Sequence, residues 1–132
     1  YKMVEKHLKP FGAMVTQSTS PLYSPEAFLC IKKTMQAAGF SVLPYQNSVP
    51  SMGQWGWQLG IRKKAMSADL LKQKLTMKKF SNIETQFFNQ DAMISMAHFG
   101  KGLFEKEGEI EPNTQFDHNI LKYYKHGSWD LY

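Results

Sequence analysis

Ala-Met-Val-Thr-Gln-Ser-Thr-Ser-Pro-Leu-Tyr-Ser-Pro-Glu-Ala-Phe, residues 13–28, is the stretch that decides the fold. An apolar run at its start gives way after Gln17 to a polar loop, and Ser24-Pro25-Glu26 then signals a helix start. Ser24 is expected to cap the first backbone N–H groups, and Pro25 at the first helical position loses no needed donor. The predicted order is therefore strand, loop, helix. In an open α/β sheet, ligands bind at the loop leaving the carboxyl end of a strand, so Gln17 is a candidate site residue.

Helical patterns lie on both sides of this strand. Residues 1–8 read as the last turns of a helix that ends before Gly12. The helix that begins after Ser24 is amphipathic and is expected to end at Gly39, which can take the positive φ of a C′ residue. The residues expected on its apolar stripe are Phe28, Ile31, Met35 and Ala38.

Two extended segments follow, at residues 40–49 and 55–61, and are predicted to pair as an antiparallel hairpin. Pro44 places the first of them at a sheet edge or a bulge. Trp55 and Trp57 alternate with small or polar residues, and we expect both rings in the core. The predicted fold class is α/β: the C-terminal half of a Rossmann-like, methyltransferase-type sheet that ends in an antiparallel hairpin, plus a mainly helical tail.

The chain changes character at Ala65, which divides it into an α/β part, residues 1–64, and a helical extension packed on it, residues 65–132. Within the extension we expect a short helix at residues 67–75 and a brief strand at residues 83–88. Asn89 is expected to cap a further helix that runs to about Phe99. The residues of that helix expected to be buried are Met93, Ile94, Met96 and Ala97.

The end of the extension carries an acidic run and an aromatic cluster. The acidic residues Glu105, Glu107, Glu109 and Glu111 are expected to form a solvated loop. The residues expected to anchor the tail are Ile120, Leu121, Tyr123, Tyr124, Trp129 and Tyr132.

Composition narrows the classes of function. The formal net charge of +5 admits nucleic acid or an anionic membrane surface as a partner, because Lys and Arg gain affinity by releasing phosphate counterions. The excess of positive charge is mild, and few aromatic residues lie among the basic ones. We therefore expect the basic residues to form a solvated face, and we expect no nucleic-acid partner. Cys30, the single cysteine, is expected to be a small buried residue. The four histidines have no i, i+4 pair and no cysteine partner, so no metal site is expected.

The sequence opens with Tyr1 in mid-pattern, which predicts a chain cut from something longer. No apolar run approaches the roughly 20 residues that span a bilayer, and no signal peptide opens the chain. We therefore expect this portion to be soluble.

Several segments in order carry a resemblance to a known family. They are Val15-Thr16-Gln17-Ser18-Thr19-Ser20-Pro21, Ala37-Ala38-Gly39-Phe40 and Val49-Pro50-Ser51-Met52-Gly53-Gln54-Trp55-Gly56-Trp57, with Gln86-Phe87-Phe88-Asn89 in the tail. Together they resemble the C-terminal part of spermidine synthases, of the bacterial type with a membrane-spanning region ahead of the catalytic domain. The resemblance covers nearly the whole chain.

This resemblance implies aminopropyl transfer from decarboxylated S-adenosylmethionine to putrescine, in polyamine biosynthesis, with no further cofactor. The Asp loop with the catalytic carboxylate would precede Tyr1, so the chain alone is expected to be inactive. Gln17 matches the glutamine that lines the diamine pocket of the family, whereas Val49 stands where a tyrosine often reaches that pocket. The family also implies a homo-oligomer at the cytoplasmic face of the bacterial inner membrane, held there only by the upstream region.

Two other interpretations stay open at this point. One keeps the fold and assigns an S-adenosylmethionine-dependent methyltransferase-like protein. The other is a non-catalytic module that binds a partner through its basic face. Without the resemblance, Gln17 itself would more simply be a residue that satisfies backbone groups at a strand end.

Overall fold

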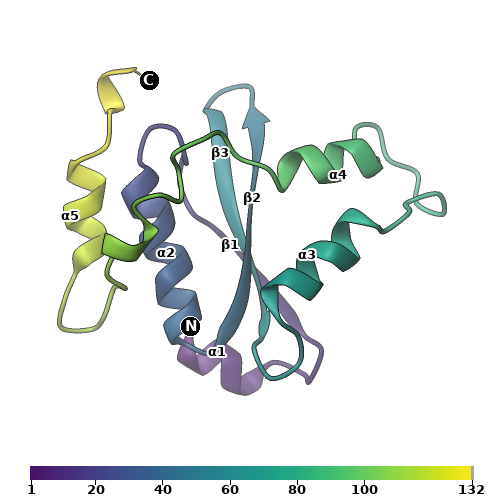
Figure 1. Ribbon diagram of the computed structural model, residues 1–132, viewed down its shortest axis with the longest axis horizontal. Coiled ribbons are helices and arrows are strands. Elements are labelled where there is room, and N and C mark those ends of the chain that lie inside the picture. Colours follow the sequence, from purple (N-terminus) through teal and green to yellow (C-terminus); the bar gives the residue numbers. More distant parts are fainter. Residues whose placement is uncertain (132) are drawn as a thin grey trace.

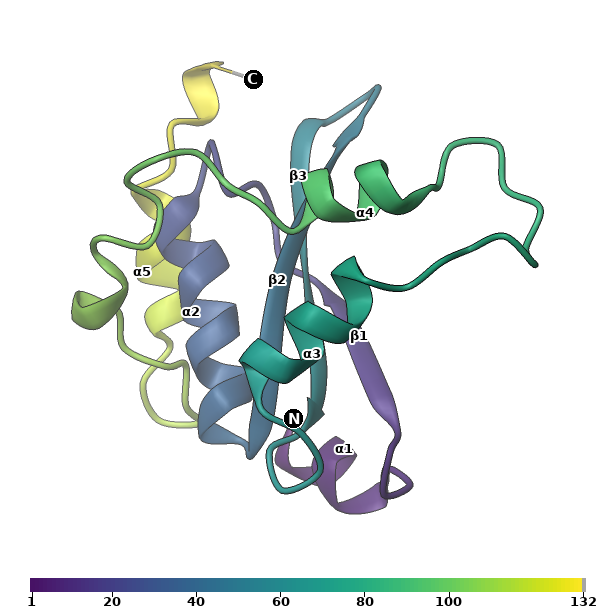
Figure 2. The ribbon, with the colours of Figure 1, turned by 45° about the vertical axis from the view of Figure 1, so that its right-hand side comes forward.

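The computed structural model describes residues 1–131, in which a three-stranded sheet lies between two layers of helices (Figures 1 and 2). Strands β1 (Ala13–Gln17), β2 (Phe40–Val49) and β3 (Gly53–Arg62) lie in the order β1-β3-β2, and both neighbouring pairs are antiparallel. The predicted α/β class, the three strands and the hairpin are confirmed. Because β3 returns between β1 and β2, the carboxyl ends of β1 and β2 lie at the same edge of the sheet.

The helices divide between the two faces of the sheet. They are α1 (Lys2–His7), α2 (Pro25–Ala37), α3 (Ala68–Thr76), α4 (Gln90–Met96) and α5 (Asn119–Lys125), with short 3₁₀ helices η1 (Glu107–Glu109) and η2 (Trp129–Leu131). Helix α2 packs on one face and carries α5 on its outer side, whereas α3 and α4 lie against β2 on the other face (Figure 2). Helix α1 lies at the end of the sheet away from the β2–β3 turn (Figure 1).

Helix α2 lies close to the sheet because β3 carries glycine where the two meet. A Cβ atom at Gly56 would lie 2.8 Å from Phe28 Cδ2, and one at Gly60 would lie 2.6 Å from Met35 Cε. Real Cβ atoms do not approach other atoms so closely, so Gly56 needs to be glycine, whereas a side chain at Gly60 would require the end of Met35 to move. The predicted stripe of α2 is confirmed at Phe28 and Met35, which are fully buried.

The expectation that Trp55 and Trp57 lie in the core is wrong. Both rings are only half-buried, and they lie on the sheet face opposite α2. The buried face of β3 carries Gly56, Gln58 and Gly60 instead. The period-2 pattern correctly identified the strand β3. The face of β3 that packs most closely is the glycine face, because α2 needs the space that small side chains leave.

The tail covers the outer side of α2. Tyr123 and Ile110 are buried with Leu29 and Cys30 of α2, and Ile120 and Tyr124 pack against the same cluster. The predicted aromatic anchoring is thus confirmed in part: Leu121 stays exposed, Trp129 stacks on Tyr124 with 38% of its surface exposed, and Tyr132 lies outside the described residues. Because the tail packs on the outer side of α2 and the sheet packs on its inner side, residues on two sides of this helix are buried.

The expected strand at residues 83–88 is wrong. The segment is a series of turns and bends that is exposed up to Phe87, with Phe88 packed edge-on against Phe80. Although β1 and β2 each pair on one side only, the segment pairs with neither of them, and its apolar residues do not enter the sheet. Asn89 does cap α4, since its Oδ1 accepts from the Ala92 N–H at 2.8 Å.

Two further expectations in the tail need correction. Helix α4 ends at Met96, earlier than predicted, and Ile94 is exposed while Met93 is buried. The acidic run is mostly exposed, but Glu107 is half-buried and forms an ion pair with Lys32 of α2 at 2.7 Å. That glutamate is therefore a structural contact rather than part of a solvated loop.

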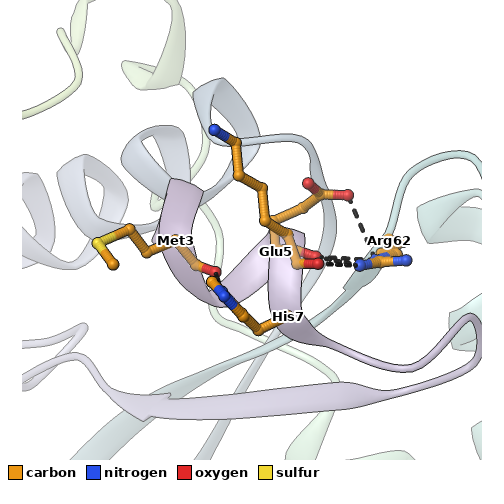
Figure 3. A network of polar contacts seen from close by, with 5 residues as sticks. Met3, Glu5, His7 and Arg62 are labelled. Atoms are coloured by element: carbon orange, nitrogen blue, oxygen red, sulfur yellow. Dashed lines mark hydrogen bonds and ion pairs between the residues drawn. The ribbon is translucent and has the colours of Figure 1, made fainter.

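Helix α1 is held to the end of β3 by a polar network around Arg62 (Figure 3). The guanidinium donates to the carbonyl oxygens of Glu5 and Lys6, which would otherwise be unsatisfied at the carboxyl end of the helix. Its Nε also lies 3.4 Å from the Glu5 carboxylate. Since α1 has no buried residue, this network is its main polar attachment among the described residues.

We expect Arg62→Ala to lower the free energy of unfolding of the chain by about 1–3 kcal/mol, because charge-assisted hydrogen bonds are lost. Arg62→Lys should recover only part of that loss, since an ammonium cannot bridge two carbonyls as the planar guanidinium does. Urea unfolding followed by circular dichroism measures both changes. The exposed neighbour Lys64→Ala is the control, and equal stabilities of all three variants would contradict this role for Arg62.

Candidate functional site

The carboxyl end of β1 is the edge where the functional candidate lies. Gln17 is the last residue of β1, and the turn between β2 and β3 lies at the same edge. The loop that follows Gln17 reaches that turn, because a Cβ atom on Gly53 would lie 3.4 Å from the Tyr23 hydroxyl. The tail also arrives here, where the Ser128 N–H donates to the Tyr23 carbonyl at 2.8 Å. Three separate parts of the chain therefore meet at Tyr23, in the loop that follows Gln17.

The structure places Gln17 with its side chain available to a ligand. Gln17 is exposed, and its side chain makes no hydrogen bond to any other part of residues 1–131. It lies opposite Trp57, which in turn lies opposite Tyr45, so the three side chains form a row on the face away from α2. Its position at a strand end is confirmed, and its role in binding remains a prediction.

The aromatic pair beside Gln17 makes one wall of this row. The rings of Tyr45 and Trp57 stack with centroids 5.5 Å apart and planes 14° from parallel. Burial raises the pKa of Tyr45, so its phenol keeps its proton at neutral pH and offers an O–H group. The row thus combines an amide, a phenol and two π-faces.

An apolar groove of about 260 Å³ continues along the same face toward α3 and α4. It is lined by Val15, Leu43, Tyr45, Leu59, Leu75, Phe88, Met93 and Met96. A larger pocket, of about 450 Å³, opens on the α2 side between the loop after β1 and the segment around Gly100. Gln17 lines neither cavity, so the sequence candidate does not coincide with either of these concave surfaces.

The loop after Gln17 is unusual because much of it is buried. Ser18, Thr19, Ser20 and Ser24 each have at most 3% of their surface exposed. Ser20 Oγ accepts from the backbone N–H groups of Leu22 and Tyr23 at 3.2 and 3.1 Å. Such local bonds satisfy the backbone of a buried loop and fix its path.

The predicted side-chain cap of α2 is wrong. Ser24 has the N-cap position and Pro25 follows as predicted, but the Ser24 hydroxyl makes no capping hydrogen bond. Its Oγ is buried without a partner among residues 1–131. The backbone provides the link instead: the Ser24 N–H donates to the Ser20 carbonyl at 3.0 Å, and the Phe28 N–H donates to the Ser24 carbonyl at 3.0 Å.

Gln58 is a site-adjacent residue that sequence reasoning missed. It is fully buried on β3, between Gly56 and Gly60 on the face toward α2. Its Nε2 donates to the Phe28 carbonyl at 3.2 Å and to Ser18 Oγ at 3.4 Å. A glutamine flanked by two glycines at period 2 was the available signal, since it marks a polar group on the face that admits a helix.

Other candidate chemistry is accounted for by packing. Cys30 is fully buried as predicted, and burial raises the pKa of its thiol, which keeps it protonated. Of the basic residues, Arg62 is bound to α1, whereas Lys63 and Lys64 are exposed. Within the described part of the chain, no three His, Cys, Asp or Glu side chains gather as metal ligands would. None of its helices combines the length and the apolar character that a membrane crossing requires.

Comparison with known proteins identifies the family. The spermine/spermidine synthase domain matches residues 1–72, more than half of the chain. The polyamine aminopropyltransferase of Oceanobacillus iheyensis is 27% identical over 134 aligned residues, which cover 100% of this chain and 24% of that protein. Polyamine aminopropyltransferase 2 of Ralstonia nicotianae is 26% identical over 125 residues, or 95% of this chain and 22% of that protein. The chain thus spans less than a quarter of the length of these relatives.

A shorter match has a higher identity. The polyamine aminopropyltransferase of Mycobacterium tuberculosis is 42% identical over 59 residues, which are 45% of this chain and 11% of that protein.

Proposed function

The chain belongs to the spermine/spermidine synthase family, and we propose that it forms the C-terminal, acceptor-side part of a polyamine aminopropyltransferase. The full-length enzyme transfers the aminopropyl group of decarboxylated S-adenosylmethionine to putrescine and releases methylthioadenosine. Support comes from the relatives described above, which are named polyamine aminopropyltransferases. In this proposal the chain alone is inactive, because the catalytic carboxylate belongs to an Asp loop that lies outside it.

The observation that carries the proposal is the free amide of Gln17 at the carboxyl end of β1. Its Oε1 can accept a hydrogen bond from an ammonium N–H of the diamine, since an amide oxygen has two lone pairs. A residue that orients a diamine must present an acceptor without being held by its neighbours, and Gln17 meets both conditions. The attacking nitrogen must lose its proton before it can act as a nucleophile, and that step falls to the carboxylate of the Asp loop.

The context of the full-length enzyme is part of the same proposal. It acts as a homo-oligomer, needs no cofactor beyond its nucleotide co-substrate, and is held at the cytoplasmic face of the inner membrane by a region outside this chain. These features are supported by the family resemblance alone.

Product identity tests this proposal against a methyltransferase of the same fold. The full-length protein is incubated with putrescine and either decarboxylated S-adenosylmethionine or S-adenosylmethionine, and the products are separated by liquid chromatography and mass spectrometry. We expect methylthioadenosine and spermidine in equal amounts from the first mixture. S-adenosylhomocysteine from the second mixture, with no methylthioadenosine from the first, would assign methyl transfer instead.

A further inference from the structure

Gln58 lowers the stability of the folded chain, so a contribution to stability does not explain why it is there. It is fully buried beneath the first turns of α2, where a Leu or Met side chain would normally lie. Its Nε2 has two acceptors, but its Oε1 has no hydrogen-bond partner among the described residues. A buried carbonyl oxygen without a partner destabilises the folded state, so packing does not explain this residue.

What Gln58 contacts is the loop that begins at Gln17. Ser18, which accepts from the Gln58 amide, is the next residue after Gln17, and Phe28 lies just past the other end of the loop. The β1–β3 pairing also continues beyond the strand, because the Ser18 N–H donates to the Gly56 carbonyl at 2.9 Å. One buried side chain therefore ties the start of the loop, at Ser18, and the first turn of α2, at Phe28, to the centre of the sheet.

The loop held in this way is strained. Thr19 has a φ of 62°, which a β-branched residue rarely adopts, and its hydroxyl is buried without a partner among the described residues. The Gly56 N–H donates to the Thr19 carbonyl at 2.8 Å and holds this conformation in place. Strain of this kind persists where the surrounding structure fixes a functional geometry.

We propose that Gln58 is a positioning residue for the amine acceptor: by fixing the start of the loop at Ser18, it sets the direction in which the Gln17 amide points. This inference rests on the proposed function. Gln58 touches no substrate and acts only through the backbone that joins Ser18 to Gln17.

Steady-state kinetics of the full-length enzyme test this role with Gln58→Leu, Thr19→Gly and, as control, Met35→Ala. Misplacing a binding group by a fraction of an ångström weakens binding, so we expect Gln58→Leu to raise the KM for putrescine by about five- to tenfold. The KM for decarboxylated S-adenosylmethionine should change less than about twofold, since its contacts lie elsewhere. Thr19→Gly relieves the strained φ, so its Tm should not fall, yet the putrescine KM should rise.

Met35→Ala provides the structural comparison, because Met35 is equally buried on the side of α2 that faces the sheet but lies against Gly60, away from the loop. It should lower Tm and leave both KM values unchanged. A putrescine KM that follows Tm across the three variants, or that stays unchanged in Gln58→Leu, would overturn the positioning role.

Amide hydrogen exchange of the same full-length variants separates this inference from the proposed function. Gln58→Leu should speed exchange in residues 17–24 and leave the carboxyl-terminal half of α2 unchanged. If the wild-type protein makes no methylthioadenosine, the proposed function fails, while the exchange data still decide whether Gln58 holds the loop. Unchanged exchange in residues 17–24 would overturn the inference even in an active enzyme.

Discussion

Replacing Phe28 with alanine is expected to lower the free energy of unfolding of the chain by about 3–5 kcal/mol, the range for a fully buried phenylalanine in a well-packed core. Phe28 has no exposed surface. Its ring fills the space left by Gly56 on one side and lies 5.7 Å from the Phe99 ring on the other. Alanine would leave a cavity between the sheet and the tail that neither layer can close.

Denaturant unfolding of the chain measures this loss, and Phe116→Ala is the matched control because 87% of that side chain is exposed. We expect the control to change stability by less than about 0.5 kcal/mol. Phe28→Ala should also speed amide exchange around Phe99, since the tail loses its contact with α2. Equal stabilities of the two variants would show that the described core is not the one that holds the chain together.

The strands and the start of α2 could be predicted because their signals are local. Alternation, Pro25 at the first helical position and Gly39 at the helix end each depend on a few neighbouring residues. Gly39 takes a φ of 98° as predicted.

The errors came from features that depend on what lies opposite in space. Trp55 and Trp57 are apolar, but the helix packs on the glycine face, so burial could not be assigned from hydrophobicity. Residues 83–88 have the composition of a strand, but they pair with neither β1 nor β2. Glu107 belongs to a run of four acidic residues that was predicted to be solvated. Its ion pair with Lys32 joins residues that are far apart in the sequence, so no local pattern indicates it.

As with the fold, only part of the candidate site could be predicted from the sequence. Gln17 follows from one rule, that ligands bind at the carboxyl ends of strands, and the structure places it there with a free side chain. Gln58 and the strained Thr19 could not be found in the same way, because their importance arises from contacts across the sheet and from one backbone angle. The division of the chain at residue 64 stays a prediction.

The central claim is that Gln17 binds the amine acceptor, and Gln17→Ala tests it with a large expected effect. Loss of a hydrogen bond to a charged ammonium costs about 1.5–3 kcal/mol, so we expect the KM for putrescine to rise by about tenfold or more. Gln17→Glu keeps an acceptor at the same place and adds charge attraction, so it should retain or lower that KM. Val15→Ala, on the same exposed face of β1, is the control.

The most direct measurement is therefore the pair of KM values, for putrescine and for decarboxylated S-adenosylmethionine, in full-length wild-type enzyme and in Gln17→Ala. The account predicts a rise for putrescine of about tenfold or more, with less than about a twofold change for the nucleotide and for Val15→Ala. An unchanged putrescine KM, or an equal rise for both substrates, would contradict it and remove Gln17 from the acceptor site.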